Sequence, residues 1–323
     1  MGLNKSLIVG VLSTLSFAAC TPQNSETSQL QTSNSQLDSS AIIDGKLVAP
    51  NEAIAKSIVA IYSQNDDENG GAICTGSLLP GNLVLTAAHC VDKYMTIIFA
   101  PDIDSASESQ SRPVDAAQVS PYWATRQTAQ KDQGDIALIH FQGSVPKGFV
   151  PATFLTDMSA LKNGTTVLLA GYGTNKVVQT PIDKNTYPDL INAIQTGKVV
   201  CDDPMNLTNC AEVAMPGSGV LRKTAVKIAD NKHGMTEVLL DQTSGTGACH
   251  GDSGGPAYVA IKGKLYLWGV TSRGANDPRN DCSKNAVYTN AYAYKVWISQ
   301  TAKKMVTSLT DPNRLNNVAT NGN

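Results

Sequence analysis

A short glycine-rich segment constrains the fold of this chain more than any other feature of its sequence. The segment reads Cys249-His250-Gly251-Asp252-Ser253-Gly254-Gly255-Pro256 and places one serine between an acid and two glycines. Glycine tolerates backbone angles that other residues avoid, so the chain can turn sharply on both sides of Ser253. In such a turn the amides of Gly251 and Ser253 could point at one negative charge, as an oxyanion requires. A surface turn that happens to hold a serine is the alternative interpretation.

The composition indicates a globular chain that is rich in β-structure. Its 323 residues are 41% hydrophobic and 16% charged, which is sufficient for a sizeable core. The net charge of -2 supplies no basic surface for nucleic acid. The 26 glycines and 15 prolines indicate frequent turns. We therefore expect β-strands joined by many turns, and no nucleic acid among the partners.

The first 41 residues are expected to precede the folded domain. Lys5 is followed by an apolar run from Leu7 to Ala19, which is short for a membrane span and has the order of a secretory signal. Phe17-Ala18-Ala19-Cys20 is similar to a bacterial lipobox, so 1–19 is expected to be a lipoprotein-type signal peptide and Cys20 the lipidated residue. Ordinary signal cleavage that leaves a free cysteine, and a retained helix, are the alternatives. Residues 20–41 are polar, which is typical of a disordered tether or propeptide.

Two further motifs place a histidine and an aspartate beside apolar strands. His89 ends the run Leu83-Val84-Leu85-Thr86-Ala87-Ala88-His89-Cys90, and Asp135 opens Asp135-Ile136-Ala137-Leu138. A lone histidine is more often structural, and an aspartate before a strand could merely cap a turn. In the order His89, Asp135, Ser253, however, the three motifs together resemble those of trypsin-like (chymotrypsin-fold) serine proteases. The resemblance extends over 42–309 and is weakest over 175–219.

This resemblance implies an all-β fold of two six-stranded antiparallel β-barrels with a C-terminal α-helix. The expected boundaries are 42–150 for the first barrel, 160–290 for the second, 291–309 for the helix and 310–323 for a polar tail. Together 42–309 would form one protease domain.

The resemblance also implies hydrolysis of peptide bonds through an acyl-enzyme. Ser253 would be the nucleophile and His89 the general base, because imidazole exchanges protons near neutral pH. Asp135 would orient the imidazole, and the amides of Gly251 and Ser253 would stabilise the oxyanion. A catalytically silent binding lipoprotein on the same fold is the rival class, although such proteins usually lose one of the three residues.

The substrate pocket and the cleft strand follow from the same resemblance. The expected pocket residues are Gly247, Ala248, Ser272, Gly274 and Ala286. Gly247 stands at the position that determines specificity and carries no carboxylate, which disfavours cleavage after lysine or arginine. We therefore expect a preference for medium or large apolar residues before the scissile bond. Residues 265–274 resemble the strand that lines the cleft, with Arg273 where tryptophan is common.

Activation by proteolysis is a further implication. Ile42-Ile43-Asp44-Gly45 resembles the start of mature trypsin-like proteases, whose zymogens are cut before the isoleucine. The new amino group of Ile42 would then pair with Asp252, because a buried carboxylate needs a counter-charge. Ala41 precedes the cut, so the activating protease would accept small residues. The alternative is that Ile42 simply begins the first strand of a domain.

The seven cysteines divide into Cys20 and three expected pairs. A hairpin through Pro80-Gly81-Asn82 would bring Cys74 to Cys90. The resemblance pairs Cys249 with Cys282, and Cys201 with Cys210 is inferred by elimination because the usual disulfides of this half do not all have counterparts. Disulfides require an oxidising compartment, so we expect a bacterial cell-envelope lipoprotein, or a secreted or periplasmic protein after processing.

The sequence gives no reason to expect a cofactor or a metal. Asp102, Asp104 and Glu108 could ligate calcium, but their loose, serine-rich spacing favours a solvated loop. Polypeptide substrates, an activating protease and, through Cys20, a membrane are the expected partners of a monomeric chain.

Overall fold

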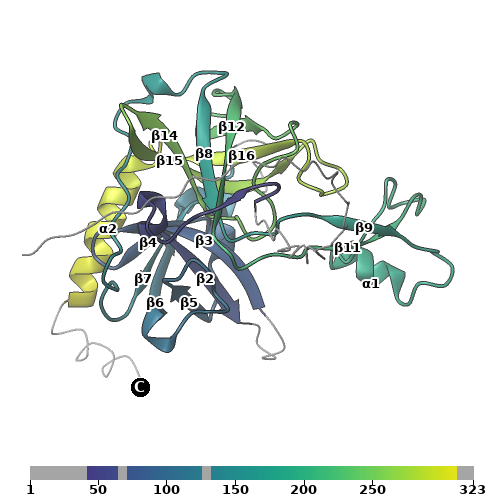
Figure 1. The fold of residues 1–323 in the computed structure, drawn as a ribbon, viewed down its shortest axis with the longest axis horizontal. Helices are drawn as coiled ribbons and strands as arrows, with labels where there is room; N and C mark the ends of the chain where they lie inside the picture. Colours follow the sequence, from purple (N-terminus) through teal and green to yellow (C-terminus); the bar gives the residue numbers. More distant parts are fainter. Residues whose placement is uncertain (1–41, 65–70, 126–131, 311–323) are drawn as a thin grey trace, which may run out of the picture. The chain divides into compact units, whose positions relative to one another are not determined.

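The computed structural model describes residues 42–64, 71–125 and 132–310. The expected signal peptide 1–19, Cys20, the expected tether 20–41 and the tail from residue 311 lie outside the described residues. Figure 1 shows the two groups of barrel strands above and below one another, with helix α2 (Lys295–Thr310) along one side.

The first barrel closes from six antiparallel strands in the order β2-β3-β4-β7-β6-β5. These strands are β2 (Ile58–Gln64), β3 (Gly71–Leu79), β4 (Leu83–Thr86), β5 (Met95–Ile98), β6 (Ser111–Val119) and β7 (Ala137–Phe141).

The second barrel also has six antiparallel strands, and the pairing of β8 with β12 closes it. Its strands are β8 (Thr166–Gly171), β12 (Arg222–Asp230), β13 (Glu237–Asp241), β14 (Pro256–Ile261), β15 (Lys264–Ala275) and β16 (Asn285–Asn290). Two closed barrels followed by a helix confirm the predicted fold class. Helix α2 begins at Lys295 and not at 291, because the amide of Ala291 still bonds the carbonyl of Trp268 in β15 at 2.8 Å.

Strands without polar alternation are buried on both faces. In β4, Leu83 and Leu85 pack in the seam between the barrels, whereas Val84 packs inside the first barrel. Successive side chains of a strand point to opposite faces, so an unbroken apolar run requires two apolar surroundings. The first barrel supplies one of them with its interior and the other with its contact to the second barrel. This two-sided burial fixes the end of β4, and therefore His89, at the seam.

The residues that follow position 41 lie along the second barrel. Ile43 and Gly247 exchange backbone hydrogen bonds of 2.9 and 3.3 Å. Strand β1 (Lys46–Leu47) then pairs with β12. The expected boundary groups these residues with the first barrel, but their pairing partners belong to the second.

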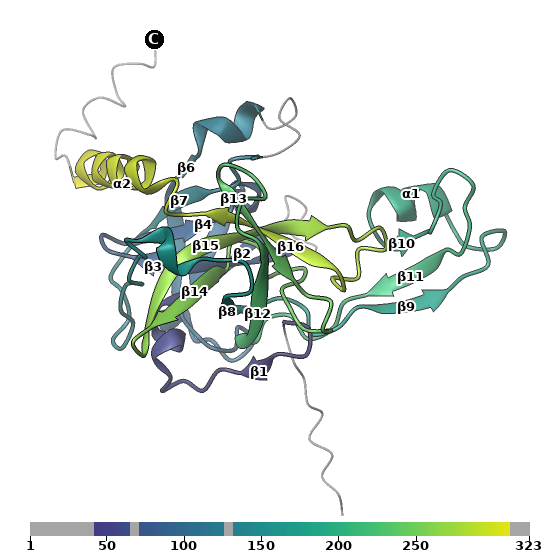
Figure 2. The same cartoon turned by 90° about the horizontal axis from the view of Figure 1, so that it is seen from above.

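An insertion between β8 and β12 forms a small unit of its own. It contains β9 (Val178–Pro181), α1 (Leu190–Gln195), β10 (Val199–Val200) and β11 (Ala211–Ala214), with its sheet in the order β10-β11-β9. Leu190, Ala193 and Val199 pack with the Cys201–Cys210 disulfide in a separate apolar core. Figures 1 and 2 both show this unit set apart from the barrel strands.

The three predicted disulfides are all present. They join Cys74 to Cys90, Cys201 to Cys210 and Cys249 to Cys282. Single turns of 3-10 helix occupy several connections: η1 (Ala53–Lys56), η2 (Ala88–Cys90), η3 (Glu108–Gln110), η4 (Pro121–Thr125) and η5 (Met158–Ala160). Within the described residues, no helix has the length and apolar character needed to cross a membrane.

Candidate active site

His89 and Asp135 meet where β4 and β7 lie side by side. His89 lies in η2 just after β4, Asp135 lies just before β7, and Thr86 pairs with Ala137. The backbone amide of His89 donates to Asp135 Oδ1 at 3.1 Å, and His89 Nδ1 lies 2.8 Å from Asp135 Oδ2. The aspartate side chain is 2% exposed and the imidazole 34%. The aspartate is therefore held in the protein while the ring faces the solvent side of the cleft.

Two residues of the second barrel also hold Asp135. The Ser272 hydroxyl donates to Asp135 Oδ2 at 2.7 Å, and the Thr289 hydroxyl donates to the Asp135 carbonyl at 2.9 Å. An ionised carboxylate only accepts hydrogen bonds, so the proton between His89 and Asp135 belongs to Nδ1. The other ring nitrogen, Nε2, is then free to accept a proton. Ser272, which the sequence placed in the substrate pocket, therefore also contacts the aspartate.

The Ser253 turn packs against the ends of the first-barrel strands that lead to His89. The amide of Thr75 donates to the Ser253 carbonyl at 2.8 Å, and the Thr75 hydroxyl donates to the Gly251 carbonyl at 3.0 Å. Gly251 and Gly254 have φ angles of +92° and +79°, which favour glycine. A Cβ at Gly254 would collide with Thr86, three residues before His89. Thr75, which sequence reasoning missed, therefore ties the serine turn to the histidine's barrel.

The amides of Gly251 and Ser253 make no hydrogen bond to any other residue that the structure describes. Among those residues there is also no hydrogen bond between the Ser253 hydroxyl and the His89 ring. Ser253 and Ser272, which bonds Asp135, line the same cavity. The turn thus carries a hydroxyl that lines the cavity and, among the described residues, two amides without a hydrogen-bond partner.

Asp252 is buried directly beneath the turn. It is 1% exposed and accepts the amides of Gly173 on Oδ1 and Cys249 on Oδ2, both at 2.8 Å. Burial raises its pKa to about 7, although these two amides and the charge of Arg222 act in the opposite direction. Removing the carboxylate from water disfavours its charged form more than these groups favour it.

The charge of Arg222 acts on Asp252, and sequence reasoning missed this residue. The side chain is fully buried, and its Nη1 donates to the Val220 carbonyl at 3.1 Å. Arg222 pairs with Gly171 across β12 and β8, and a Cβ at Gly171 would fall on the Asp252 carboxylate. Paired residues of antiparallel strands direct their side chains to the same face, so Arg222 is on the face where Asp252 lies. The alternation of β12 was the available signal, because Arg222 shares its inward parity with Val226 and Ile228.

Ile42, the residue expected to activate the chain, is fully buried in the core of the second barrel. Its φ is +56°, and the next residue, Ile43, is bonded to Gly247. Gly247 lies five residues before Asp252. No hydrogen bond between Ile42 and Asp252 is found in the described part of the chain.

A cavity of about 240 Å³ opens beside Ser253. Four of the expected pocket residues line it: Ala248, Ser272, Gly274 and Ala286. Gly247 does not, because the side chain of Gln242 occupies the space where a Cβ of residue 247 would lie. The Gln242 amide is held from both ends: it donates to the carbonyls of Ala248 and Cys282 at 3.0 Å and accepts the Ala248 amide at 2.8 Å. A neutral carboxamide thus forms the floor that sequence reasoning gave to glycine.

One carboxyl group, that of Asp277, is among the residues that line the cavity. Its Oδ2 accepts the Cys282 amide at 2.6 Å. Burial, together with the neighbouring carboxyl of Asp281, raises the pKa of Asp277.

Two aromatic and basic neighbours complete the cleft. The rings of Trp123 and His89 have centroids 6.4 Å apart, and Trp123 lies in η4 beside the histidine. His250 lies on the rim of the cavity. Trp123 belongs to no recognisable motif, so the sequence offered no signal for it, whereas His250 lies within the serine segment itself.

Two clusters of side chains in the described ranges have metal-ligand geometry, Cys74–His89–Cys90 and Cys249–His250–Cys282. Their cysteines are paired in disulfides and offer no thiolate. In the loop considered for calcium, Asp102 Oδ1 accepts the amide of Asp104 at 3.0 Å.

Known proteins share both the sequence pattern and the fold. The family described as Trypsin matches residues 42–298. Chymotrypsin-like elastase family member 1 of Macaca fascicularis is 29% identical over 234 residues, which are 71% of this chain and 78% of that protein. Snake venom serine protease 3 of Protobothrops jerdonii is 26% identical over 269 residues, which are 83% of this chain and 90% of that protein. The solved structure of HL collagenase has the same fold, with a TM-score of 0.56 and 18% identity over 81% of this chain and 99% of that one. The chain therefore belongs to the trypsin family and is a serine endopeptidase.

Proposed function

We propose that this chain hydrolyses peptide bonds through an acyl-enzyme on Ser253, with His89 as general base and Asp135 as its orienting carboxylate. The observation that carries the proposal is the double contact of His89 with Asp135, at 3.1 and 2.8 Å, next to a serine turn with two uncommitted amides. The first contact fixes the backbone of the histidine and the second fixes its ring. Nε2 is then the nitrogen that remains for the serine proton.

The reaction has two halves. Ser253 Oγ attacks the carbonyl carbon of the scissile bond while its proton passes to His89 Nε2, and the carbonyl oxygen becomes an oxyanion. The amides of Gly251 and Ser253 donate to that oxyanion, and each such donor lowers the activation free energy by roughly 3 kcal/mol. The imidazolium then protonates the leaving amine, and the C–N bond breaks to give the acyl-enzyme. In the second half, water gives a proton to His89 Nε2 and attacks the acyl carbon. The imidazolium then returns the proton to Ser253 Oγ as the ester bond breaks, which releases the carboxylic acid product.

We further propose that the pocket prefers apolar residues before the scissile bond. Its floor is the neutral carboxamide of Gln242, whose polar atoms are committed to the backbone. Among the described residues, Asp277 is the one acid that lines it; one of its oxygens accepts the Cys282 amide, and the cation of Arg273 belongs to the same lining. A digest of a diverse peptide mixture tests the preference, and a product set dominated by cleavage after lysine or arginine would contradict it.

A catalytically silent binding lipoprotein is the alternative function. A fluorophosphonate reacts only with an activated serine, so we expect it to label the processed wild type and not Ser253→Ala. A His89→Ala variant serves as the second control, since it keeps the hydroxyl and loses the base. Equal labelling of all three proteins, or of none, would favour the alternative.

The chain is proposed to be a zymogen that is exported and anchored by a lipid on Cys20. Cleavage before Ile42 would free an amine to pair with Asp252, whose burial makes a counter-charge favourable. The three disulfides are consistent with export. A monomer and an activating protease that accepts Ala41 complete the proposal. Sequencing the amino terminus of the active form tests it, and Ile42 is the expected first residue.

A further inference from the structure

The position that carries tryptophan in similar proteases holds a buried ion pair in this chain. Arg273 binds Glu237 with two hydrogen bonds, Nη1 to Oε1 at 2.8 Å and Nη2 to Oε2 at 2.7 Å. The Glu237 side chain is 0% exposed and that of Arg273 is 27% exposed. A buried carboxylate is tolerated when a cation and hydrogen bonds satisfy it, and the planar guanidinium matches both oxygens.

Glu237 also reaches across the seam between the barrels. Its Oε1 accepts the backbone amide of Gln133 at 3.0 Å, and Gln133 is two residues before Asp135. Next to this contact, Asp132 accepts the amides of Met235 and Thr236, both at 2.7 Å. Residues 235–237 of the second barrel thus hold 132–133 in the connection that leads from the first barrel to Asp135.

Arg273 contacts the other support of the aspartate as well. Its Nη1 lies 3.4 Å from the hydroxyl of Ser272, which donates to Asp135 Oδ2 at 2.7 Å. One guanidinium therefore touches the two groups, Glu237 and Ser272, that contact Asp135 or the residues just before it. The pair stands on the second barrel, whereas Asp135 arrives from the first.

We propose that Arg273 and Glu237 are positioning residues, and that their ion pair clamps the Gln133–Asp135 segment and thereby sets the contact of Asp135 with His89. The inference rests on the function proposed above for His89 and Asp135. This role is additional to the place of Arg273 in the lining of the cavity.

The variant Arg273→Met tests the clamp, because it keeps the length of the stem and removes the guanidinium. Glu237 is then a buried carboxylate without its cation, and the Gln133 contact weakens when that carboxylate relaxes or takes up a proton. Small displacements in an active site lower the rate strongly, so we expect kcat to fall between about 10- and 100-fold. Arg273 also lines the cavity, whereas Glu237 does not, so a change in KM reports the pocket and the fall in kcat reports the clamp.

A double-mutant cycle separates the clamp from a loss of either side chain alone. Glu237→Gln keeps an oxygen that can accept the Gln133 amide, and Arg273→Met/Glu237→Gln leaves no unpaired charge. We expect the double variant to recover a large part of the kcat that Arg273→Met loses, which is a coupling that independent sites do not show. Arg273→Lys, which keeps the charge without the fork, should give an intermediate kcat and guards against a failure of Arg273→Met to fold.

A spectroscopic readout makes the test independent of turnover. The low-field proton resonance of His89 Nδ1–H reports its hydrogen bond to Asp135 and can be recorded in a Ser253→Ala background. We expect it to shift or broaden in Arg273→Met and to return in the double variant. If the proposed catalytic function failed, Ser253 labelling would be lost while this resonance would still report the clamp.

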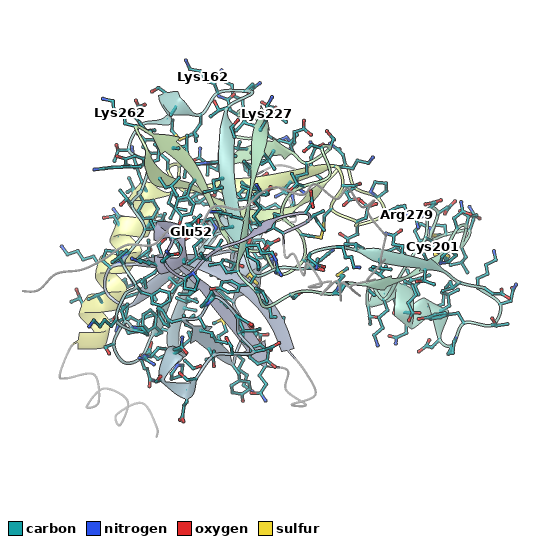
Figure 3. The ribbon with its side chains drawn as sticks, viewed as in Figure 1. Glu52, Lys162, Cys201, Lys227, Lys262 and Arg279 are labelled. Carbon is teal, nitrogen blue, oxygen red and sulfur yellow. A yellow bond between two sulfur atoms is a disulfide. The ribbon has the colours of Figure 1, made fainter. Side chains whose placement is uncertain are left out.

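Lys223→Met is the matched control. Lys223 forms an ion pair with Glu52, and its side chain is 27% exposed, as is that of Arg273. Figure 3 labels Glu52 of that pair. We expect wild-type kcat and an unchanged resonance. The clamp is refuted if Arg273→Met keeps wild-type kcat and resonance, or if its effect is confined to KM and varies with the residues of the substrate before the scissile bond.

Discussion

At the scale of single residues, the floor of the pocket depends on a contact between two positions. Gly247 has no side chain, and Gln242 fills the space that one would need. The effect of a substitution at Gly247 on folding and activity therefore depends on the residue at position 242.

Gly247→Asp is expected to lower activity strongly on every substrate and to give no cleavage after lysine or arginine. The new side chain would collide with Gln242, and overpacking of this kind costs about 1–3 kcal/mol. Gly247→Asp/Gln242→Ala should restore folding and add cleavage after basic residues, because the acid then reaches the cavity. Peptide-library digestion with thermal melts checks both variants. Basic specificity in the single variant would show that Gln242 does not occupy the floor.

The buried Asp252 makes the stability of the uncut chain depend on pH. Its pKa is about 7 in the folded chain against 3.8 for an aspartate in water, so folding favours the protonated form. Below pH 3.8 both states hold the proton; between 3.8 and about 7 only the folded state does, and the free energy of unfolding falls as pH rises. The gap corresponds to about 4 kcal/mol, which is lost by the time pH exceeds about 7.

Urea unfolding of the uncut Ser253→Ala chain between pH 4 and 8 measures this slope. Asp252→Asn should remove it, whatever its constant effect on stability, because asparagine does not titrate. The form that begins at Ile42 should also show a shallower slope, since a free amine would favour the charged carboxylate. An equal slope in Asp252→Asn would assign the pH dependence to another group.

At the scale of elements, the insertion between β8 and β12 is held by its own contacts. It has a separate apolar core and the Cys201–Cys210 disulfide, which closes a sequence separation of 9 residues. Its connection to the barrels includes Arg279, in the β15–β16 loop, which bonds Asp202 and Gln179. Figure 3 shows Arg279 beside the unit that carries Cys201.

Removing that disulfide is expected to loosen the insertion alone. A loop of this length gains roughly 2–3 kcal/mol from its cross-link. In Cys201→Ser/Cys210→Ser, limited proteolysis should cut within 175–219 while the unfolding midpoint of the barrels stays near the wild-type value. Cys249→Ser/Cys282→Ser is the contrast, because that disulfide lines the cavity and its loss should lower activity. A fall of the barrel midpoint in the first variant would show that the insertion and barrels unfold together.

The secondary-structure elements differ in how well the sequence around them predicts them. The β4 run, the hairpin to Cys90 and the helix after the second barrel were predictable, because burial on two faces and tight turns depend on residues that are close in sequence. The start of α2 was predicted four residues early, since the contact of Ala291 with Trp268 is a tertiary one. Residues 175–219 had no assigned structure because a small independent core lacks a strong period.

At the scale of the whole molecule, we propose that a single cut both activates the protease and releases it from the membrane. The Cys20 anchor and the cut before Ile42 lie on opposite sides of the 20–41 segment, so one cleavage would both free the Ile42 amine and separate the protease from its lipid. A variant whose cut is blocked, Ala41→Pro, should stay in the membrane fraction. Its activity should be at least about 100-fold lower, the effect of losing an ordered oxyanion donor.

Fractionation followed by activity assays tests this coupling. Cys20→Ser should be found in the soluble fraction with or without the cut and should still need the cut for activity, which separates location from activation. Active enzyme that retains residues 21–41 on its own chain would overturn the proposal.

The family, the barrel fold, the disulfide pairs and the residues proposed for catalysis could all be predicted from the amino-acid sequence. Each of the three motifs, around His89, Asp135 and Ser253, is complete within a few consecutive residues, so a short pattern is sufficient to identify it. Three contacts could be found only in the folded chain: Gln242 forms the pocket floor, Arg222 and Asp252 share a buried face, and Glu237, bound to Arg273, accepts the amide of Gln133. Those contacts join strands from distant parts of the chain, and their partners are fixed by the register and closure of two barrels, which no short pattern encodes.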